Sequence, residues 1–326
     1  MERYKELKSG DPFVFPGLEK QFTVVGYIPG GFNRIILKAN CNGGTGTRIL
    51  KIAQAHEGDA DADQFKGKCG QIHDYQQSLQ RLGVLTPSPI TTHENVIDGK
   101  RFLLETSPFT GQSVHEMMLT APRNDVLELC QQMIDVALKP IFSQNLRADG
   151  NLPCGVDMIP RNFTKDPGVM HYVDLWPPKL WLDGEPTLEY PEPMDTKVIQ
   201  LGIFRHFTIK GVAQAFLVQL CRIRPELRRE FQRLVDGALK GMGLHEELGW
   251  LQQQPARQFQ NGGDLKQIIE PLGYEQIYGL REIACELAFQ GQISAGQLER
   301  IFKDSHFQDT PLPSATILQI KEVLFH

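Results

Sequence analysis

The sequence lacks any pair of cysteines at the spacing of a metal-binding or redox motif. Its six cysteines are scattered along 326 residues, which excludes zinc ribbons and Cys-x-x-Cys redox sites. Isolated thiols in a chain of this length are typical of a reduced protein rather than of a disulfide scaffold. We therefore expect a cytoplasmic protein.

Long apolar runs and a strong charge of one sign are also missing. No run approaches the ~20 residues of a membrane helix, and the first residues, MERYKELKSGD, contain no apolar stretch of a signal peptide. We therefore expect no membrane partner. The net charge is −5, from 34 basic and 39 acidic residues. At this net charge we do not expect a protein whose whole surface binds nucleic acid.

The first hundred residues are rich in β-branched and aromatic residues and interrupted by glycine turns. This pattern predicts three strands at 22–28, 34–38 and 48–53, and two more at 90–97 and 101–104. Between them, apolar residues recur at helical spacing over 61–82. The sequence therefore predicts a β-rich lobe with one helix.

The chain becomes helical from about residue 113. A polar, proline-dotted stretch covers 149–197, and the Gly/Gln-rich segment 241–263 predicts a loop. We expect an α+β protein with a nucleotide-binding lobe at 1–105 and a helical lobe at 106–326, in which 241–326 has no recognisable motif. Helices are predicted at about 125–141, 197–223, 225–240, 264–270, 275–290, 294–304 and 314–325.

Three polar residues follow one another at a spacing suited to phosphoryl transfer. Asn162 lies five residues after Asp157, and Asp174 lies twelve residues after Asn162. This reaction needs a carboxylate that accepts the proton of the attacking hydroxyl, and hard oxygen ligands that hold Mg²⁺ on the phosphates. We predict that Asp157 is the catalytic carboxylate and that Asn162 and Asp174 are the metal ligands.

This pattern resembles the protein-kinase-like superfamily, and most closely its aminoglycoside phosphotransferase and choline kinase group. In that group the loop reads D-x-x-P-x-N, as in Asp157–Pro160–Asn162 here, and an apolar-apolar-D turn such as the one ending at Asp174 follows. The resemblance implies a bilobal fold whose first lobe is a five-stranded antiparallel sheet with one helix. It also implies ATP and Mg²⁺ as cofactors, with transfer of the γ-phosphate to a hydroxyl of a small molecule.

The resemblance assigns further nucleotide-binding residues in the first lobe. Lys51, on a strand after a glycine-containing hairpin, matches the lysine that binds the phosphates. The carbonyl of Glu105 and the N–H of Ser107 match the groups that hydrogen-bond adenine. The glycine-containing loop that covers the phosphates corresponds to Gly30, Gly31 and Asn33.

The sequence departs from the family at three supports of the reaction. The helix at 61–82 offers no Glu to pair with Lys51, and Gln71 or Asp74 is the available substitute. Gly155 stands where a His is usual, and Ile159 where a Lys or His faces the transferred phosphate. These departures favour an alternative, a pseudokinase that binds nucleotide or acts as a scaffold for a partner protein. A protein kinase is a third alternative, although the Asp-Phe-Gly turn and an Ala-Pro-Glu segment are absent.

Two charged segments remain open to more than one interpretation. The acidic stretch 183–195 attracts a cationic acceptor, such as an aminosugar or amino alcohol, or it is a solvated loop. The arginines between 222 and 233 form a phosphate-binding patch, or a solvated helix face that pairs with Glu226 and Glu230. We expect ordinary packing or surface positions, not zinc ligation or nucleophilic chemistry, for His171, His206, His245 and Cys154.

Overall fold

The structure is a computed structural model, and the chain divides into two compact units. The first comprises Met1–Gln80 and Thr86–Gly111, and the second comprises Arg81–Leu85 and Gln112–His326. The boundary expected at residue 105 falls inside a strand of the first unit, Lys100–Pro108. The residues described are 2–28, 34–43, 46–54, 62–188, 196–253, 284–285, 288, 291, 293–303, 312 and 314–325.

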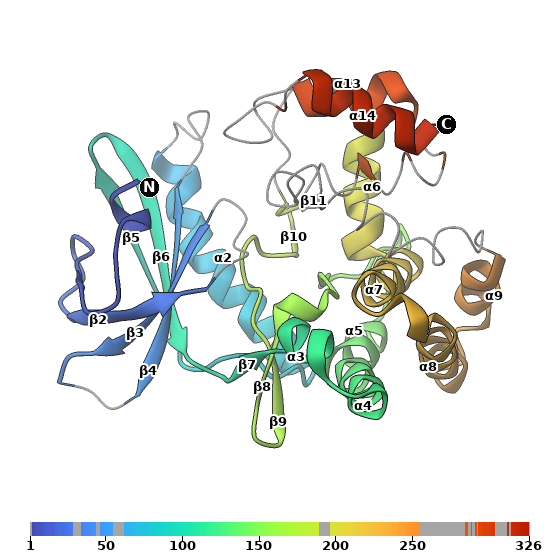
Figure 1. Cartoon of the computed structure of the whole chain (residues 1–326), viewed down its shortest axis with the longest axis horizontal. Coiled ribbons are helices and arrows are strands. Elements are labelled where there is room, and N and C mark those ends of the chain that lie inside the picture. The colour runs from blue at the N-terminus through green and yellow to red at the C-terminus, as the bar shows by residue number, and fades with distance from the viewer. Residues whose placement is uncertain are drawn as a thin grey trace. The chain divides into compact units, whose positions relative to one another are not determined.

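The first unit is built on a six-stranded sheet in the order β1-β2-β3-β4-β6-β5 (Figure 1). Every pairing in it is antiparallel. A short helix α1, Glu2–Lys5, belongs to the same unit, as does the long helix α2, Ala62–Arg81, up to Gln80. The strands are β1 Pro12–Phe13, β2 Phe22–Tyr27, β3 Arg34–Cys41, β4 Thr47–Gln54, β5 Thr91–Ile97 and β6 Lys100–Pro108.

The five predicted strands and the predicted helix are therefore confirmed, and the prediction of a five-stranded sheet misses one edge strand. β1 contains only two residues, which is too short for an alternating pattern to be visible in the sequence. It pairs with β2 through Pro12 and Phe13, and Phe13 is 1% exposed. The edge strand thus exists because it buries an aromatic side chain.

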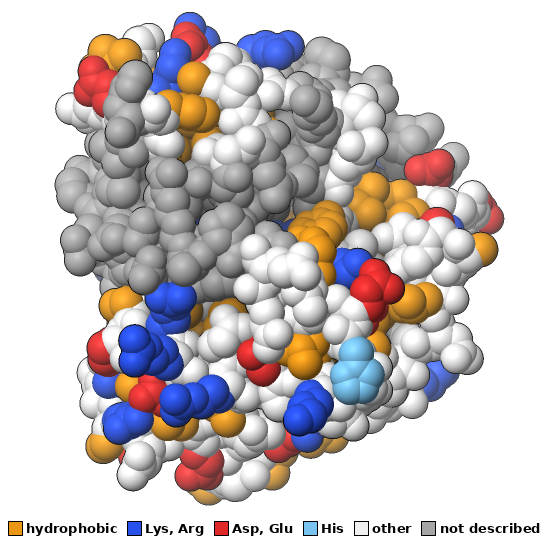
Figure 2. Space-filling model, turned by 90° about the vertical axis from the view of Figure 1, so that its right-hand side faces the viewer, with side chains coloured by type: hydrophobic (Ala, Val, Ile, Leu, Met, Phe, Trp, Pro, Cys, Tyr) orange, Lys and Arg blue, Asp and Glu red, His pale blue; other side chains and the backbone are white. Residues whose placement is uncertain are grey.

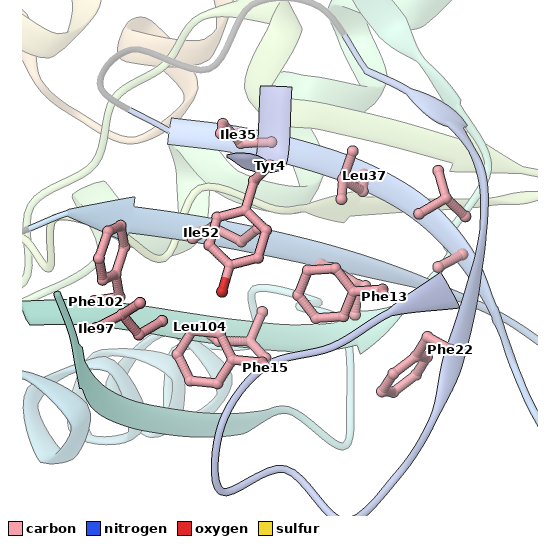
Figure 3. Packing of buried hydrophobic residues seen from close by; sticks show 13 residues of the cluster. Tyr4, Phe13, Phe15, Phe22, Ile35, Leu37, Ile52, Ile97, Phe102 and Leu104 are labelled. Atoms are coloured by element: carbon pink, nitrogen blue, oxygen red, sulfur yellow. The ribbon is translucent and has the colours of Figure 1, made fainter. Parts of the chain in front are cut away.

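The two faces of this sheet differ in what they bury. One face packs against aromatic side chains from the N-terminal segment, including Tyr4, Phe13 and Phe15 (Figure 3). Leu50 and Ile52 of β4 belong to this apolar cluster. Since side chains alternate along a strand, Lys51 between them points to the opposite face.

The helix α2 lies against that opposite face. Nε2 of His73 on α2 lies 3.2 Å from Oγ1 of Thr92 on β5, and Thr92 is paired with Glu105 on β6. Directly paired residues of an antiparallel ladder share one face. Lys51, Thr92 and Glu105 therefore lie on the face that carries α2.

The second unit is mainly helical and contains a small antiparallel sheet, β7-β8-β9. The strands are β7 Gln112–Ser113, β8 Phe163–Asp166 and β9 Val169–Tyr172, followed by a two-stranded pair, β10 Trp181–Leu182 and β11 Glu185–Pro186. The helices are α3 Val114–Thr120, α4 Arg123–Met133, α5 Lys139–Phe142, α6 Thr196–Phe207, α7 Ile209–Ile223, α8 Arg228–Gly241, α9 His245–Gln253, α13 Ala295–Lys303 and α14 Ser314–Phe325.

The α+β class predicted from the sequence is confirmed, whereas the loop predicted over 241–263 is wrong where α9 forms. Its glycine and glutamine content concealed apolar residues at helical spacing. Leu251 is buried, and the Trp250 ring packs edge-on against Phe204 with 5.6 Å between the ring centroids. The helix predicted at 264–270 and most of the one at 275–290 lie outside the described residues.

The last two helices, α13 and α14, share an apolar cluster that includes Leu298, Phe302 and Ile320. This confirms the helices predicted near 294–304 and 314–325. None of the helices within the described residues is both long and apolar enough to span a membrane.

Candidate functional site

The loop that carries Asp157 is held by backbone hydrogen bonds on both sides. The Gly155 N–H donates to the Lys179 carbonyl at 2.9 Å, and the Val156 N–H donates to the His206 carbonyl at 3.1 Å. The Asp157 N–H donates to the Tyr172 hydroxyl at 3.3 Å. The loop is thus fixed between the end of α6 and the segment that follows β9.

Gly155 is required by this packing. A Cβ at this position would lie 2.5 Å from the His206 carbonyl oxygen and 2.7 Å from a ring carbon of Phe207. The sequence interpretation, that a supporting His is missing here, is incomplete. The end of α6 occupies the space that any side chain at residue 155 would need.

Asn162 brings the three residues of the predicted motif together. Its Nδ2 donates to Asp157 Oδ2 at 3.2 Å and to the Asp157 carbonyl at 3.1 Å, and it lies 3.4 Å from Asp174 Oδ2. A 3₁₀ turn, Pro160–Asn162, supplies the local bend, and the Val173 N–H donates to the Asn162 carbonyl at 2.8 Å. The spacing read from the sequence therefore corresponds to one cluster, while the roles of its members remain predictions.

Two basic side chains that the sequence analysis did not select face the two carboxylates. Lys179 Nζ lies 2.8 Å from Asp174 Oδ2, with the two side chains 3% and 14% exposed. Arg205 Nη2 lies 3.7 Å from Asp157 Oδ1, with the side chains 8% and 17% exposed. The cluster thus contains two acidic and two basic groups. For Lys179, the one available signal in the sequence was its position five residues after Asp174. No sequence signal pointed to Arg205, which lies on α6.

The donor set has the chemistry that Mg²⁺ prefers. Among the described residues no three His, Cys, Asp or Glu side chains are placed to hold a metal ion. Mg²⁺ at a nucleotide site, however, takes only one or two carboxylates from the protein and further oxygens from the phosphates. Asp157 Oδ1 is buried and accepts no hydrogen bond. Asp174 is therefore a carboxylate that fits the ion, in competition with Lys179, whereas Asn162 turns its Nδ2 toward both carboxylates, so ligation by its amide oxygen stays a prediction.

In the first unit, Lys51 has a carboxylate partner that the sequence analysis did not assign. Lys51 on β4 lies directly opposite Glu105 on β6, and its Nζ is 2.8 Å from Glu105 Oε1. The two side chains are 8% and 1% exposed. A neighbouring strand thus supplies an acid to Lys51, and the pairing expected with Gln71 or Asp74 on α2 stays a prediction.

The adenine-binding groups were predicted on the backbone of Glu105 and Ser107. Glu105 lies in the sheet interior, since it is paired with Lys51 on β4 and with Thr92 on β5. Ser107 is paired with Ile49 on β4 and lies beyond the last pair between β5 and β6. Both residues are buried, at 1% and 2% exposed, and the adenine contacts stay predictions. The predicted phosphate loop, Gly30, Gly31 and Asn33, lies outside the described residues.

His206 lies beneath the Asp157 loop as a buried side chain. Burial lowers the pKa of His206 to about 4, against the opposing charge of Asp157. Its Nδ1 is buried without a hydrogen-bond partner. Since the folded state disfavours the charged form, protonation of His206 favours unfolding.

We predict an acid-sensitive stability that depends on His206. An unfolded His titrates near 6.5, so the contribution of this residue is complete above pH 6.5 and is lost as the pH falls from 6.5 towards 4. Between pH 7.5 and 5.5 the loss amounts to about 1.4 kcal/mol. Urea unfolding at both pH values measures it. The His206→Gln variant should lose this slope, whereas His245→Gln, on the exposed start of α9, should retain it.

The remaining candidates behave as ordinary structural residues. Burial raises the pKa of the Cys154 thiol to about 12, which agrees with the predicted packed cysteine. Arg224 Nε pairs with Glu226 at 2.5 Å, but the Arg224 side chain is 19% exposed and its Nη1 donates to the Met118 and Ala121 carbonyls. Arg222 is buried, so neither arginine belongs to a solvated face. Acidic and basic side chains are interspersed on the face in Figure 2. Of the acidic stretch 183–195, Asp183 and Glu185 are exposed, and residues 189–195 lie outside the described residues.

Comparisons with known proteins find similarity among solved structures alone. No family model and no curated protein matches the sequence. The structure of vaccinia related kinase 3 is 12% identical, covers 82% of this chain and 93% of its own, and has a TM-score of 0.41. The ROP18 kinase domain in complex with AMP-PNP and sucrose is 12% identical, with 68% and 70% covered and a TM-score of 0.42. The M. tuberculosis PknI kinase domain is 16% identical, with 73% and 99% covered and a TM-score of 0.37. The chain is thus similar to protein kinase domains, and no comparison singles out the small-molecule branch.

Proposed function

We propose that this protein is an ATP-dependent phosphotransferase that acts on a hydroxyl group of a small molecule. The observation that carries the proposal is the amide of Asn162, which contacts Asp157 and lies 3.4 Å from Asp174. One short loop and Asp174, two residues after β9, thereby bring two carboxylates and an amide side by side. Phosphoryl transfer requires this combination and little covalent chemistry from the protein.

Each residue of the cluster has a distinct role in this proposal. Asp157 orients the acceptor hydroxyl and takes its proton. Asn162 and Asp174 hold Mg²⁺, which when bound neutralises charge on the phosphates. Lys51, kept in place by Glu105, holds the nucleotide phosphates in the first unit. Ile159 offers no charge to the transferred phosphate, and Arg205 is the basic residue that lies beside Asp157 instead.

For the acceptor, we propose a small amine-bearing alcohol such as an aminosugar or amino alcohol. The exposed carboxylates of Asp183 and Glu185 follow Asp174 closely in sequence and favour a cationic molecule. Incubation with γ-labelled ATP and panels of aminosugars, nucleosides and neutral sugars tests the class. Equal labelling of neutral sugars would remove the argument for an amine.

Nucleotide binding is the first property to test. We predict that Mg²⁺·ATP at about 100 times its Kd stabilises the wild type by about 2.7 kcal/mol, because a ligand that binds only the folded state shifts unfolding by mass action. The Asp174→Asn variant should lose most of this stabilisation. Thermal unfolding measures both. The control is Asp166→Asn, which removes an exposed carboxylate at the end of β8 and should respond like the wild type.

A second candidate function is a pseudokinase that binds nucleotide or a protein partner without transfer. The pairing of Lys179 with Asp174 and of Arg205 with Asp157 favours it, because both acidic groups already have a basic partner. Stabilisation by ATP without transfer to any acceptor, and without slow ATP hydrolysis, would select this alternative.

A further inference from the structure

Lys179 is fixed on the carboxylate that is predicted to bind the metal. Its Nζ donates to Asp174 Oδ2 at 2.8 Å and to the Pro177 carbonyl at 3.1 Å. Its own carbonyl accepts the Gly155 N–H at 2.9 Å, which ties its backbone to the Asp157 loop. With its side chain 3% exposed, the ammonium group occupies a defined position.

Among the residues that the structure describes, each of the two carboxylates near this position faces a basic group before any metal ion binds. Asp174 faces Lys179, and Asp157 faces Arg205. His206, the nearby titratable group beneath the loop, is neutral because burial lowers its pKa. A divalent cation that approaches Asp174 without nucleotide therefore meets the buried ammonium group of Lys179.

We propose that Lys179 acts as a tethered cation that keeps Asp174 from binding a divalent metal until nucleotide phosphates arrive. This inference rests on the proposed function and deepens it. The phosphates carry the negative charge that compensates Lys179, so metal and nucleotide bind together and tighten each other's binding. Lys179 is thus a positioning residue that makes metal binding dependent on nucleotide.

The test measures binding of Mn²⁺ to the full chain by the loss of its free EPR signal, without nucleotide. Mn²⁺ is the probe because it accepts the oxygen ligands that suit Mg²⁺. We expect Lys179→Met to bind Mn²⁺ at least about tenfold more tightly than the wild type, because a repelling charge has been removed. Lys179→Arg keeps the charge and should behave like the wild type.

Two further variants identify the site. Adding Asp174→Asn to Lys179→Met should abolish the gain, since the gained affinity depends on that carboxylate. Lys240→Met, which removes an exposed charge from the last turn of α8, should leave Mn²⁺ binding unchanged. Equal Mn²⁺ affinity of Lys179→Met and the wild type would overturn the inference, as would an equal gain in Lys179→Arg.

The wild type alone provides a second measurement in case Lys179→Met does not fold. We expect ATP to lower the Kd for Mn²⁺ by at least about tenfold at a site that Asp174→Asn removes. If the wild type bound Mn²⁺ at the Asp174-dependent site with the same Kd with and without ATP, the role of Lys179 would be refuted. If Mn²⁺ binds to the wild type and the variants as expected but none of these proteins transfers phosphate, the inference about Lys179 stands and the proposed function fails.

Discussion

Replacing Asp157 with Asn should reduce phosphate transfer by about 10³-fold while leaving nucleotide binding intact. The amide keeps the shape of the side chain but cannot take a proton from the acceptor hydroxyl. Asp157 Oδ1 is buried, accepts no hydrogen bond within the described residues and lies 3.7 Å from Arg205 Nη2, so its lone pairs are not used by the cluster. Transfer of label from γ-labelled ATP to the acceptor, with thermal stabilisation by Mg²⁺·ATP measured in parallel, separates the two effects.

The matched control is again Asp166→Asn, which makes the same chemical change on the exposed end of β8. It should transfer phosphate at the wild-type rate. If Asp157→Asn retained full activity, the proton acceptor would have to be sought elsewhere. If it lost Mg²⁺·ATP binding together with activity, Asp157 would be acting as a ligand of the metal rather than as the base.

The cluster around Asn162 could be predicted because its members are close in sequence. Asp157, Asn162 and Asp174 are joined by a single turn and a hairpin, so their spacing limits where they can lie. Their basic partners could not be found in that way. Arg205 approaches from α6, and its contact with Asp157 exists only because α6 ends against the loop. A spacing argument carries no information about such a contact.

The same limit explains why Glu105 was not predicted as a partner of Lys51. The family pattern directed attention to α2, because the usual acidic partner lies on that helix. The pairing register of β4 and β6 instead places Glu105 opposite Lys51. A strand register between segments fifty residues apart depends on the whole sheet, and the alternation of side chains within one strand does not specify it.

In the fold, most predictions from a long pattern succeeded, but the single helix predicted over 197–223 is wrong at Thr208, which caps α7 and separates it from α6. The strands from β2 to β6 show runs of β-branched and aromatic residues, and α2 extends over twenty residues. The two-residue strand β1 and the helix α9 had too few residues, or the wrong composition, to stand out. Gly155 is a different case. The sequence suggested the loss of a supporting His, but the packing of α6 requires a glycine at this position.

A second glycine controls how α6 meets α7, and it gives the largest expected effect on stability. Gly211 lies in the first turn of α7, where its N–H donates to Oγ1 of the capping residue Thr208 at 3.0 Å. A Cβ on Gly211 would lie 1.7 Å from the Phe204 carbonyl oxygen and 2.4 Å from the carbonyl carbon. Backbone atoms cannot rotate away from such a contact, so α6 and α7 would have to separate.

We therefore expect Gly211→Ala to destabilise the protein by about 3 kcal/mol or more. Separation of the helices would also move Arg205 and His206 away from the Asp157 loop, so the acid sensitivity assigned to His206 should weaken with it. Urea unfolding at pH 7.5 and 5.5 measures both. The control is Gly237→Ala in α8, where a Cβ would meet no atom within 4 Å. There alanine should stabilise the helix by about 0.5–1 kcal/mol, because it restricts the unfolded chain. Equal behaviour of the two variants would show that α6 and α7 are not packed as closely as Gly211 implies.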